Sequence, residues 1–119
     1  MKKNILSYIA QVIGRSSESS TVKTAYKKFK EPENTAVFTT KFITADKHAI
    51  TLVKHNSDDN TWEFFSDDKF DDYEAVAKVV SLKEIIALDS SVLEIADLAA
   101  GYCAHRKLRN ESWEIALIK

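Results

Sequence analysis

The chain has 119 residues, 45% of them hydrophobic and 29% charged, which suits one folded domain and excludes a disordered or fibrous chain. Seventeen basic and eighteen acidic residues leave a net charge of −1, so the overall charge indicates neither a nucleic-acid nor a membrane partner. The one cysteine, Cys103, cannot form an internal disulfide, which favours a reducing compartment. We therefore expect a single domain over residues 1–119.

The first residues, MKKNILSYIAQVIG, combine two lysines with an apolar stretch, as the start of a signal peptide would. Polar residues interrupt this stretch, and the sequence after it, RSSESS, offers no small-residue cleavage site. The apolar residues instead recur at helical spacing. They are Ile5, Leu6, Ile9, Val12 and Ile13. This pattern predicts an amphipathic helix, and no apolar run approaches membrane-spanning length, so we expect a cytoplasmic protein.

A second helix is predicted after the Ser-rich break at 16–20, because Ser20 or Thr21 can cap it. Its apolar face consists of Val22, Ala25, Tyr26 and Phe29. Pro32 then ends the helix, since proline cannot continue the hydrogen-bond ladder. Residues 1–34 should therefore form a helical N-terminal segment. Its apolar face must be covered, either by the sheet or by a second copy of the chain in a homodimer.

From Thr35 the apolar pattern changes to a period of two, which predicts strands. The stretches are TAVFTTKFIT, HAITLVKH and TWEFFS, with short polar connections at 45–48 and 56–60. We expect residues 36–66 to form three antiparallel strands. Trp62 and Phe64 share one face of the last strand, where large aromatic side chains should anchor the core, so Trp62 should be largely buried.

The later elements are shorter. VAKVV predicts a strand, and SLKE and SVLE have the spacing of capping boxes that open two short helices hinged at Asp89–Ser90. GYCAHRKL and SWEIALI predict a closing hairpin around Arg109–Asn110. The predicted fold class is α+β: an antiparallel sheet of about five to six strands with helices packed on one face.

The charges are unevenly distributed along the chain. Residues 1–30 carry seven basic side chains and one acidic one, a net of +6, whereas residues 57–74 carry eight acidic side chains and one lysine, a net of −7. Such a block can be solvated surface or can orient a partner of opposite charge. The partner-binding candidates are Asp58, Asp59, Trp62, Asp67, Asp68, Asp71 and Asp72.

Motifs for catalysis or metal binding are weak in this sequence. His48, His55 and His105 are scattered, and none has a second ligand at metal-site spacing, so surface histidines are the expectation. Cys103 and His105 would point the same way from one strand, but neighbouring side chains on a strand run parallel rather than converge. A buried cysteine beside a solvated histidine is therefore favoured. We expect no catalytic residue, no metal and no cofactor.

Two charged segments could in principle bind calcium or nucleic acid: the acidic stretch after Phe65 and the basic N-terminal segment. The acidic stretch SDDKFDDYE places its carboxylates in adjacent pairs, and residues 56–80 contain no glycine, unlike a calcium-binding EF-hand loop. The aromatic residues of the basic N-terminal segment lie on its apolar faces, where they pack rather than stack on bases. Neither calcium nor nucleic acid is therefore an expected partner.

Several stretches together resemble a family of small bacterial domains that is catalogued as immunity-protein-like (immunity protein thirty-three). The similarity includes the T-T-K-F start, the W-x-F-F-S strand end, V-S-L-x-E-I-I, the block LDSSVLEIADL, Gly101 and Trp113, and it covers residues 35–113. The sequence departs from the family pattern at Ala99, where a proline is often found. The resemblance implies an α+β domain without catalytic residues or cofactor, whose members are proposed to neutralise toxins.

The function hypothesis is a non-enzymatic cytoplasmic binding protein of immunity type that sequesters a basic partner protein, such as a toxin. The alternatives are a small enzyme or ligand-binding domain with an unrecognised pocket, for which Cys103 and His105 are the candidates, and a regulatory module that dimerises through its N-terminal helices. An enzyme needs polar side chains from different segments to converge in a concavity, whereas a binding protein needs an exposed surface.

Overall fold

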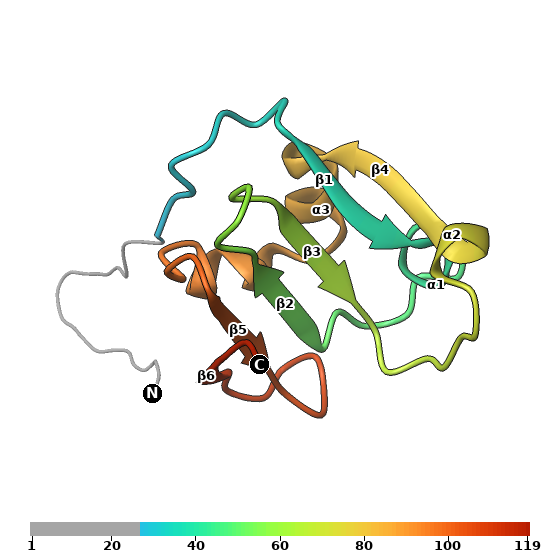
Figure 1. Cartoon of the computed structure of the whole chain (residues 1–119). Coiled ribbons are helices and arrows are strands. Elements are labelled where there is room, and N and C mark those ends of the chain that lie inside the picture. The colour runs from blue at the N-terminus through green and yellow to red at the C-terminus, as the bar shows by residue number, and fades with distance from the viewer. Residues whose placement is uncertain (1–26) are drawn as a thin grey trace, which may run out of the picture.

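Ten short elements follow one another in the computed structural model, which describes residues 27–119 (Figure 1). In chain order they are β1 (Ala36–Thr40), α1 (Lys41–Thr44), β2 (Leu52–His55), β3 (Trp62–Phe65), α2 (Tyr73–Val76), β4 (Ala77–Ser81), α3 (Leu82–Leu88), the 3-10 helix η1 (Ser90–Ile95), β5 (Tyr102–His105) and β6 (Glu114–Leu117). The class is α+β. The predicted helix of residues 5–13 lies outside the described residues.

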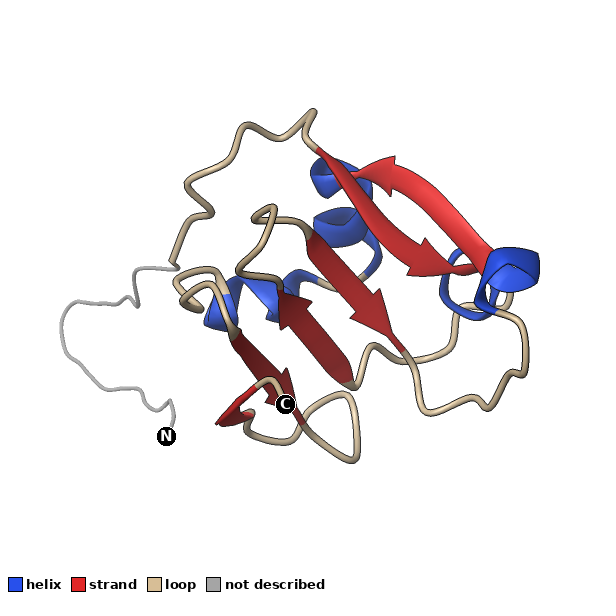
Figure 2. Cartoon of the chain, viewed as in Figure 1, coloured by secondary structure: helices blue, strands red, loops and turns tan. Residues whose placement is uncertain are grey.

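The strands form one six-stranded sheet in the order β4-β1-β3-β2-β5-β6, and α3 and η1 lie behind it in the view of Figure 2. The sheet is mixed, so the prediction of a wholly antiparallel sheet was wrong. β1 runs parallel to β3, with Phe38 opposite Glu63, while the other strand pairs are antiparallel. β3 lies between β1 and β2, which is why residues 36–66 are not an antiparallel meander.

The physical cause of this difference lies just after β1. The period-two pattern of TAVFTTKFIT extends to Thr44, but Lys41–Thr44 form the helical turn α1. That turn ends β1 at Thr40 and places Ile43 in the core, where it is 2% exposed. The connection of residues 45–51 then carries the chain past β3 to β2. The parallel junction is reinforced by a side chain, since the Thr39 hydroxyl donates to the Phe64 carbonyl at 2.8 Å.

The core lies between the sheet and the two helical segments behind it. Alternate residues of the strands enter it, among them Val37, Val53, Phe64 and Ala104, all fully buried. The two helices and the segment after η1 contribute a second set of buried side chains: Leu82, Ile85, Val92, Ile95 and Leu98. Trp62 is 2% exposed, which confirms the prediction that it is largely buried.

The two predicted helix starts have different outcomes. The Ser81 hydroxyl accepts the Glu84 N–H at 3.1 Å and caps α3, as the first capping box predicts. The second box was wrong in its cap: Asp89, rather than Ser91, caps η1, and the Asp89 carboxylate accepts both the N–H and the hydroxyl of Ser91. Asp89 is the cap because it directly precedes the first residue of η1, Ser90, and its carboxylate reaches the N–H of the second, Ser91.

Residues 27–35 run along the core without helical structure, so the predicted second helix does not extend through its described part. Phe29 packs edge-on against Trp62, with ring centroids 4.9 Å apart. The Trp62 indole N–H donates to the Glu31 carboxylate at 2.9 Å. We call residues 27–35 the N-terminal strap, because these two contacts fix it to the sheet.

Candidate functional site

The predicted acidic residues fall into two groups at opposite ends of β3. Asp58 and Asp59 lie in the turn before the strand, and the other four lie in the loop between β3 and α2. A strand of this length separates its ends by roughly 10 Å. The structure therefore does not gather the six carboxylates into a single rim, and each end of β3 must be considered by itself.

Trp62 belongs to the core rather than to a contact surface. Its ring stacks on that of His55, with centroids 4.0 Å apart, and Phe29 covers its edge. His55 donates through Nδ1 to the Leu98 carbonyl at 2.7 Å, because a carbonyl can only accept. His55 is therefore a half-buried packing residue, unlike the expected surface histidine. The inclusion of Trp62 among the partner-binding residues is corrected: its ring is not available to a partner.

The turn before β3 is held by hydrogen bonds between its own residues. The Asp59 carboxylate accepts both the N–H of Thr61, at 3.1 Å, and its hydroxyl, at 2.8 Å. These hydrogen bonds lower the pKa of Asp59. Asn60 adopts a positive φ of 61°, a conformation that asparagine tolerates better than most residues. Asp59 therefore serves the turn, although its side chain is exposed like that of Asp58.

The loop after β3 is tied down through two of its carboxylates. Asp68 accepts a hydrogen bond from His48 Nδ1 at 2.8 Å and another from the Ser66 hydroxyl. Both bonds lower the pKa of Asp68, the one from Ser66 more strongly, and the bond to Asp68 raises the pKa of His48. Asp72 caps α2 by accepting the Glu74 N–H at 3.0 Å. Asp67 and Asp71 are left as exposed carboxylates on an anchored loop.

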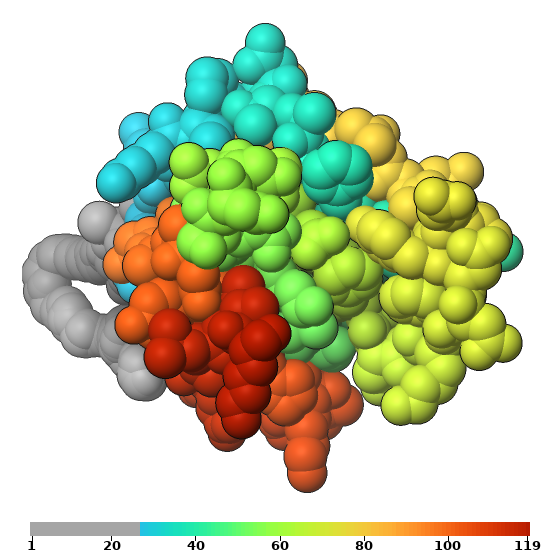
Figure 3. Space-filling view, viewed as in Figure 1, coloured from blue at the N-terminus to red at the C-terminus, as the bar shows by residue number. Residues whose placement is uncertain are grey.

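Aromatic side chains lie beneath this loop, on the sheet face away from α3 and η1. Phe65 packs against Phe70 and Tyr73, with ring centroids 6.4 and 5.8 Å apart. Phe70 is 40% exposed. The Tyr73 hydroxyl donates to Glu63 at 3.4 Å, and burial, followed by the Glu63 charge, raises its pKa. We call residues 65–73 the acidic-aromatic loop; it forms the yellow-green surface at the right of Figure 3.

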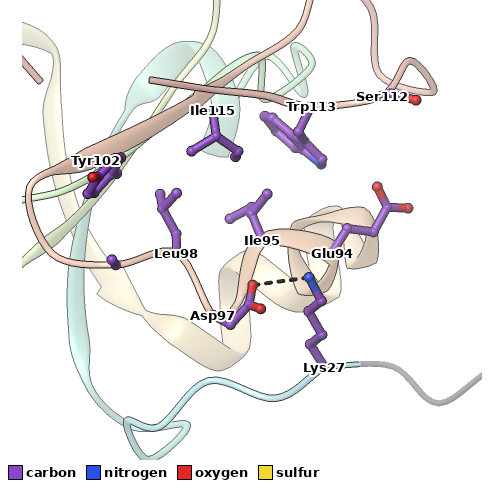
Figure 4. A pocket seen from close by; sticks show the side chains of 10 residues that line it. Lys27, Glu94, Ile95, Asp97, Leu98, Tyr102, Ser112, Trp113 and Ile115 are labelled. Carbon is purple, nitrogen blue, oxygen red and sulfur yellow. Dashed lines mark hydrogen bonds and ion pairs between the residues drawn. The ribbon is translucent and has the colours of Figure 1, made fainter. Parts of the chain in front are cut away.

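The sheet end opposite this loop carries a pocket of about 620 Å³ (Figure 4). Its side chains come from η1, from the segment after it and from the β5–β6 hairpin, with one residue of the N-terminal strap. They are Lys27, Glu94, Ile95, Asp97, Leu98, Ala99, Tyr102, Ser112, Trp113 and Ile115. Apolar side chains face one another across the cavity, and Lys27 and Asp97 form an ion pair at its edge, 3.1 Å apart.

A buried ion pair holds the wall of this pocket. Arg106 lies 3.0 Å from Asp89 and donates through Nε to the Ile50 carbonyl at 3.1 Å. Its guanidinium stacks over the Trp113 ring, 3.9 Å from the ring centroid. Burial lowers the pKa of Arg106, although the charge of Asp89 opposes that effect. The network joins the start of η1 to the closing hairpin and so positions Trp113 in the pocket.

The sequence candidates for catalysis, Cys103 and His105, belong to neither the acidic-aromatic loop nor the pocket. Cys103 and His105 lie on β5, opposite Lys54 and Leu52 in the pairing register, and neither lines the pocket. Within residues 27–119, no group of three histidine, cysteine or acidic side chains is arranged to hold a metal ion. The same residues include no helix that is long and apolar enough to cross a membrane.

Comparison with known proteins adds no assignment: no family, no curated protein and no solved structure matches this chain. The candidate residues that sequence reasoning missed are Phe70 and the pocket side chains. Phe70 had a signal, because it is an aromatic residue between two acidic pairs, where a merely solvated loop would not need one. The pocket had none, because its residues come from four separate parts of the sequence.

Proposed function

We propose that the protein is a non-enzymatic binding protein of immunity type, cytoplasmic in location, that captures a basic partner protein through the acidic-aromatic loop. The observation that carries the proposal is the placement of Phe70 between two exposed carboxylates, Asp67 and Asp71. Residues 66–74 hold five acidic side chains and one lysine, a net of −4 in a chain whose net charge is −1. The resemblance to the immunity-protein-like family supports the same reading.

The physical roles of these residues differ. Exposed carboxylates steer a basic partner toward the loop, which raises the association rate more than the final affinity. An aromatic side chain can supply the apolar anchor that slows dissociation. Phe65 and Tyr73 support Phe70 from below, and the hydrogen bonds of Asp68 and Asp72 fix the loop. A fixed loop loses less conformational entropy on binding than a free one.

The test uses the protein encoded by the gene beside this one, because an immunity gene is expected next to the gene of its toxin. Growth arrest by that protein, relieved by co-expression of this chain, would support the proposal. Asp67→Asn with Asp71→Asn should slow association and reduce its salt dependence. Phe70→Ala should instead speed dissociation. Both rates can be measured by surface plasmon resonance at low and high ionic strength.

The matched control is Asp58→Asn with Asp59→Asn, which removes the same charge at the other end of β3. If that variant slows association as much as the loop variant does, the loop is not the binding surface. If the neighbouring protein neither arrests growth nor binds this chain, the immunity function itself is wrong. Asp68 and Asp72 are left unchanged because they hold the loop together.

A further inference from the structure

Several apolar side chains at and beside the pocket are exposed to solvent. Ile115 is 54% exposed, Leu117 63% and Tyr102 37%. These residues are directly paired neighbours on one face of the β5–β6 hairpin, since Tyr102 lies opposite Leu117 and Ala104 opposite Ile115. Tyr102 and Ile115 line the pocket together with Leu98 and Trp113 and make one apolar surface with them (Figure 4), and Leu117 is paired beside Tyr102. A contiguous surface of this kind usually contacts another apolar segment.

The described chain begins at the edge of that surface. Lys27 lines the pocket and pairs with Asp97, while the N-terminal strap after it is fixed at Phe29 and Glu31. Residues 1–26 are therefore joined to the described fold at the rim of the pocket, through Lys27. Residues 14–26, between the apolar residues of 5–13 and Lys27, are enough to span about 45 Å when extended, so the pocket is within reach.

The sequence of residues 1–26 complements the pocket in two ways. Its apolar residues at 5–13 recur at helical spacing, so one face can be apolar throughout. Its charged residues are basic except for Glu18, whereas Glu94 and Asp97 stand at the rim of the pocket. Apolar burial with opposite charges at the edge is the usual composition of a helix-in-groove contact.

We propose that the apolar face of residues 5–13 docks into the pocket of its own chain, against Leu98, Tyr102, Trp113 and Ile115. The occupant is a segment of the same molecule, because the N-terminal strap attaches this segment beside the pocket. It can therefore bind without the diffusional encounter that a second molecule would need. The inference does not depend on the proposed partner-binding function, since the acidic-aromatic loop lies at the other end of the sheet.

Trp113 offers a direct readout in the full-length chain. Ile9→Asp with Val12→Asp should remove the apolar face, shift the Trp113 emission to the red and increase its quenching by acrylamide. The matched control, Ser7→Asp with Gln11→Asp, adds the same charge on the opposite face of the predicted helix and should leave the emission unchanged. The same variants with Trp113→Phe report Trp62 alone, which should not change because Trp62 is buried in the core.

A second measurement distinguishes docking within one chain from pairing of two copies. In a Cys103→Ser background, Val12→Cys with Ile115→Cys should form an intramolecular disulfide under mild oxidation, and Ser7→Cys with Ile115→Cys should not. Analytical ultracentrifugation should give the mass of a monomer throughout. A disulfide-linked dimer, or a dimer that dissociates in the Ile9→Asp, Val12→Asp variant, would overturn docking within one chain. Equal Trp113 responses in the apolar-face variant and its control would overturn the contact altogether.

Discussion

Asp68 connects two loops that are distant in the sequence, because it accepts from His48 while it also accepts from Ser66. The pKa of His48 is raised above its ordinary 6.5, so its stabilisation is complete below that pH and is lost as the pH rises through the raised value. The pKa of Asp68 is lowered below 3.8, so its stabilisation is present above that pH and is lost as the pH falls through the lowered value.

The His48–Asp68 pair should therefore contribute most between pH 3.8 and pH 6.5. Asp68→Asn should lower the thermal unfolding midpoint most within that window, and the difference from the unsubstituted protein should shrink as the pH rises through the raised pKa of His48. The effect should be small, because the His48 ring is solvent-exposed. Melting curves of both proteins across this range check the prediction, with Asp58→Asn as the control. A difference that is constant with pH would contradict it.

At the scale of elements, Asp89 sits where α3 ends and η1 begins and performs two tasks there. It caps η1 through Ser91, and its carboxylate pairs with Arg106, whose side chain is 1% exposed. Removal of one partner from a buried pair leaves the other charge unpaired in the core, which costs more than the pair itself contributes. The junction between the helices and the closing hairpin therefore depends on one carboxylate.

Asp89→Ala should lower the free energy of unfolding by about 3–5 kcal/mol, because the Arg106 charge stays buried without its partner. Arg109 provides the control: it approaches the same carboxylate at 3.6 Å but is 51% exposed, so Arg109→Ala should cost less than about 1 kcal/mol. Urea denaturation measures both. If the two substitutions cost the same, the burial of Arg106 is not what makes the pair important.

Sequence patterns predicted the elements better than their arrangement. The capping serine of α3, the strand before it and the closing hairpin follow from local spacing, so they could be identified. The turn α1 could not, because Lys41–Thr44 continue the period-two pattern of β1 while tertiary packing draws Ile43 into the core. Strand order is also set by packing, and so the parallel pairing of β1 with β3 was missed.

At the scale of the whole molecule, the fold separates residues that are neighbours in the sequence. This separation decides where the candidate sites lie. The acidic block of residues 57–74 is continuous in sequence, yet β3 divides it between two ends of the sheet. Alternation along that strand also sends Trp62 into the core and Phe65 to the other face, under Phe70. The number of acidic and aromatic residues in this stretch does not predict which of them are buried or exposed. That depends on where the strand begins and on which of its faces meets the helices.

The parallel junction between β1 and β3 has a consequence for how the molecule opens. β1 and β4 share five residue pairs, and α3 follows β4 without a break, whereas β1 meets β3 through a single pair and the Thr39 hydroxyl. We expect β4, β1 and α3 to detach as one cooperative unit before the rest unfolds. In native-state hydrogen exchange, their amides should share one opening free energy below that of the β2–β3 amides. A common value for all four strands would mean instead that the sheet unfolds only as a whole.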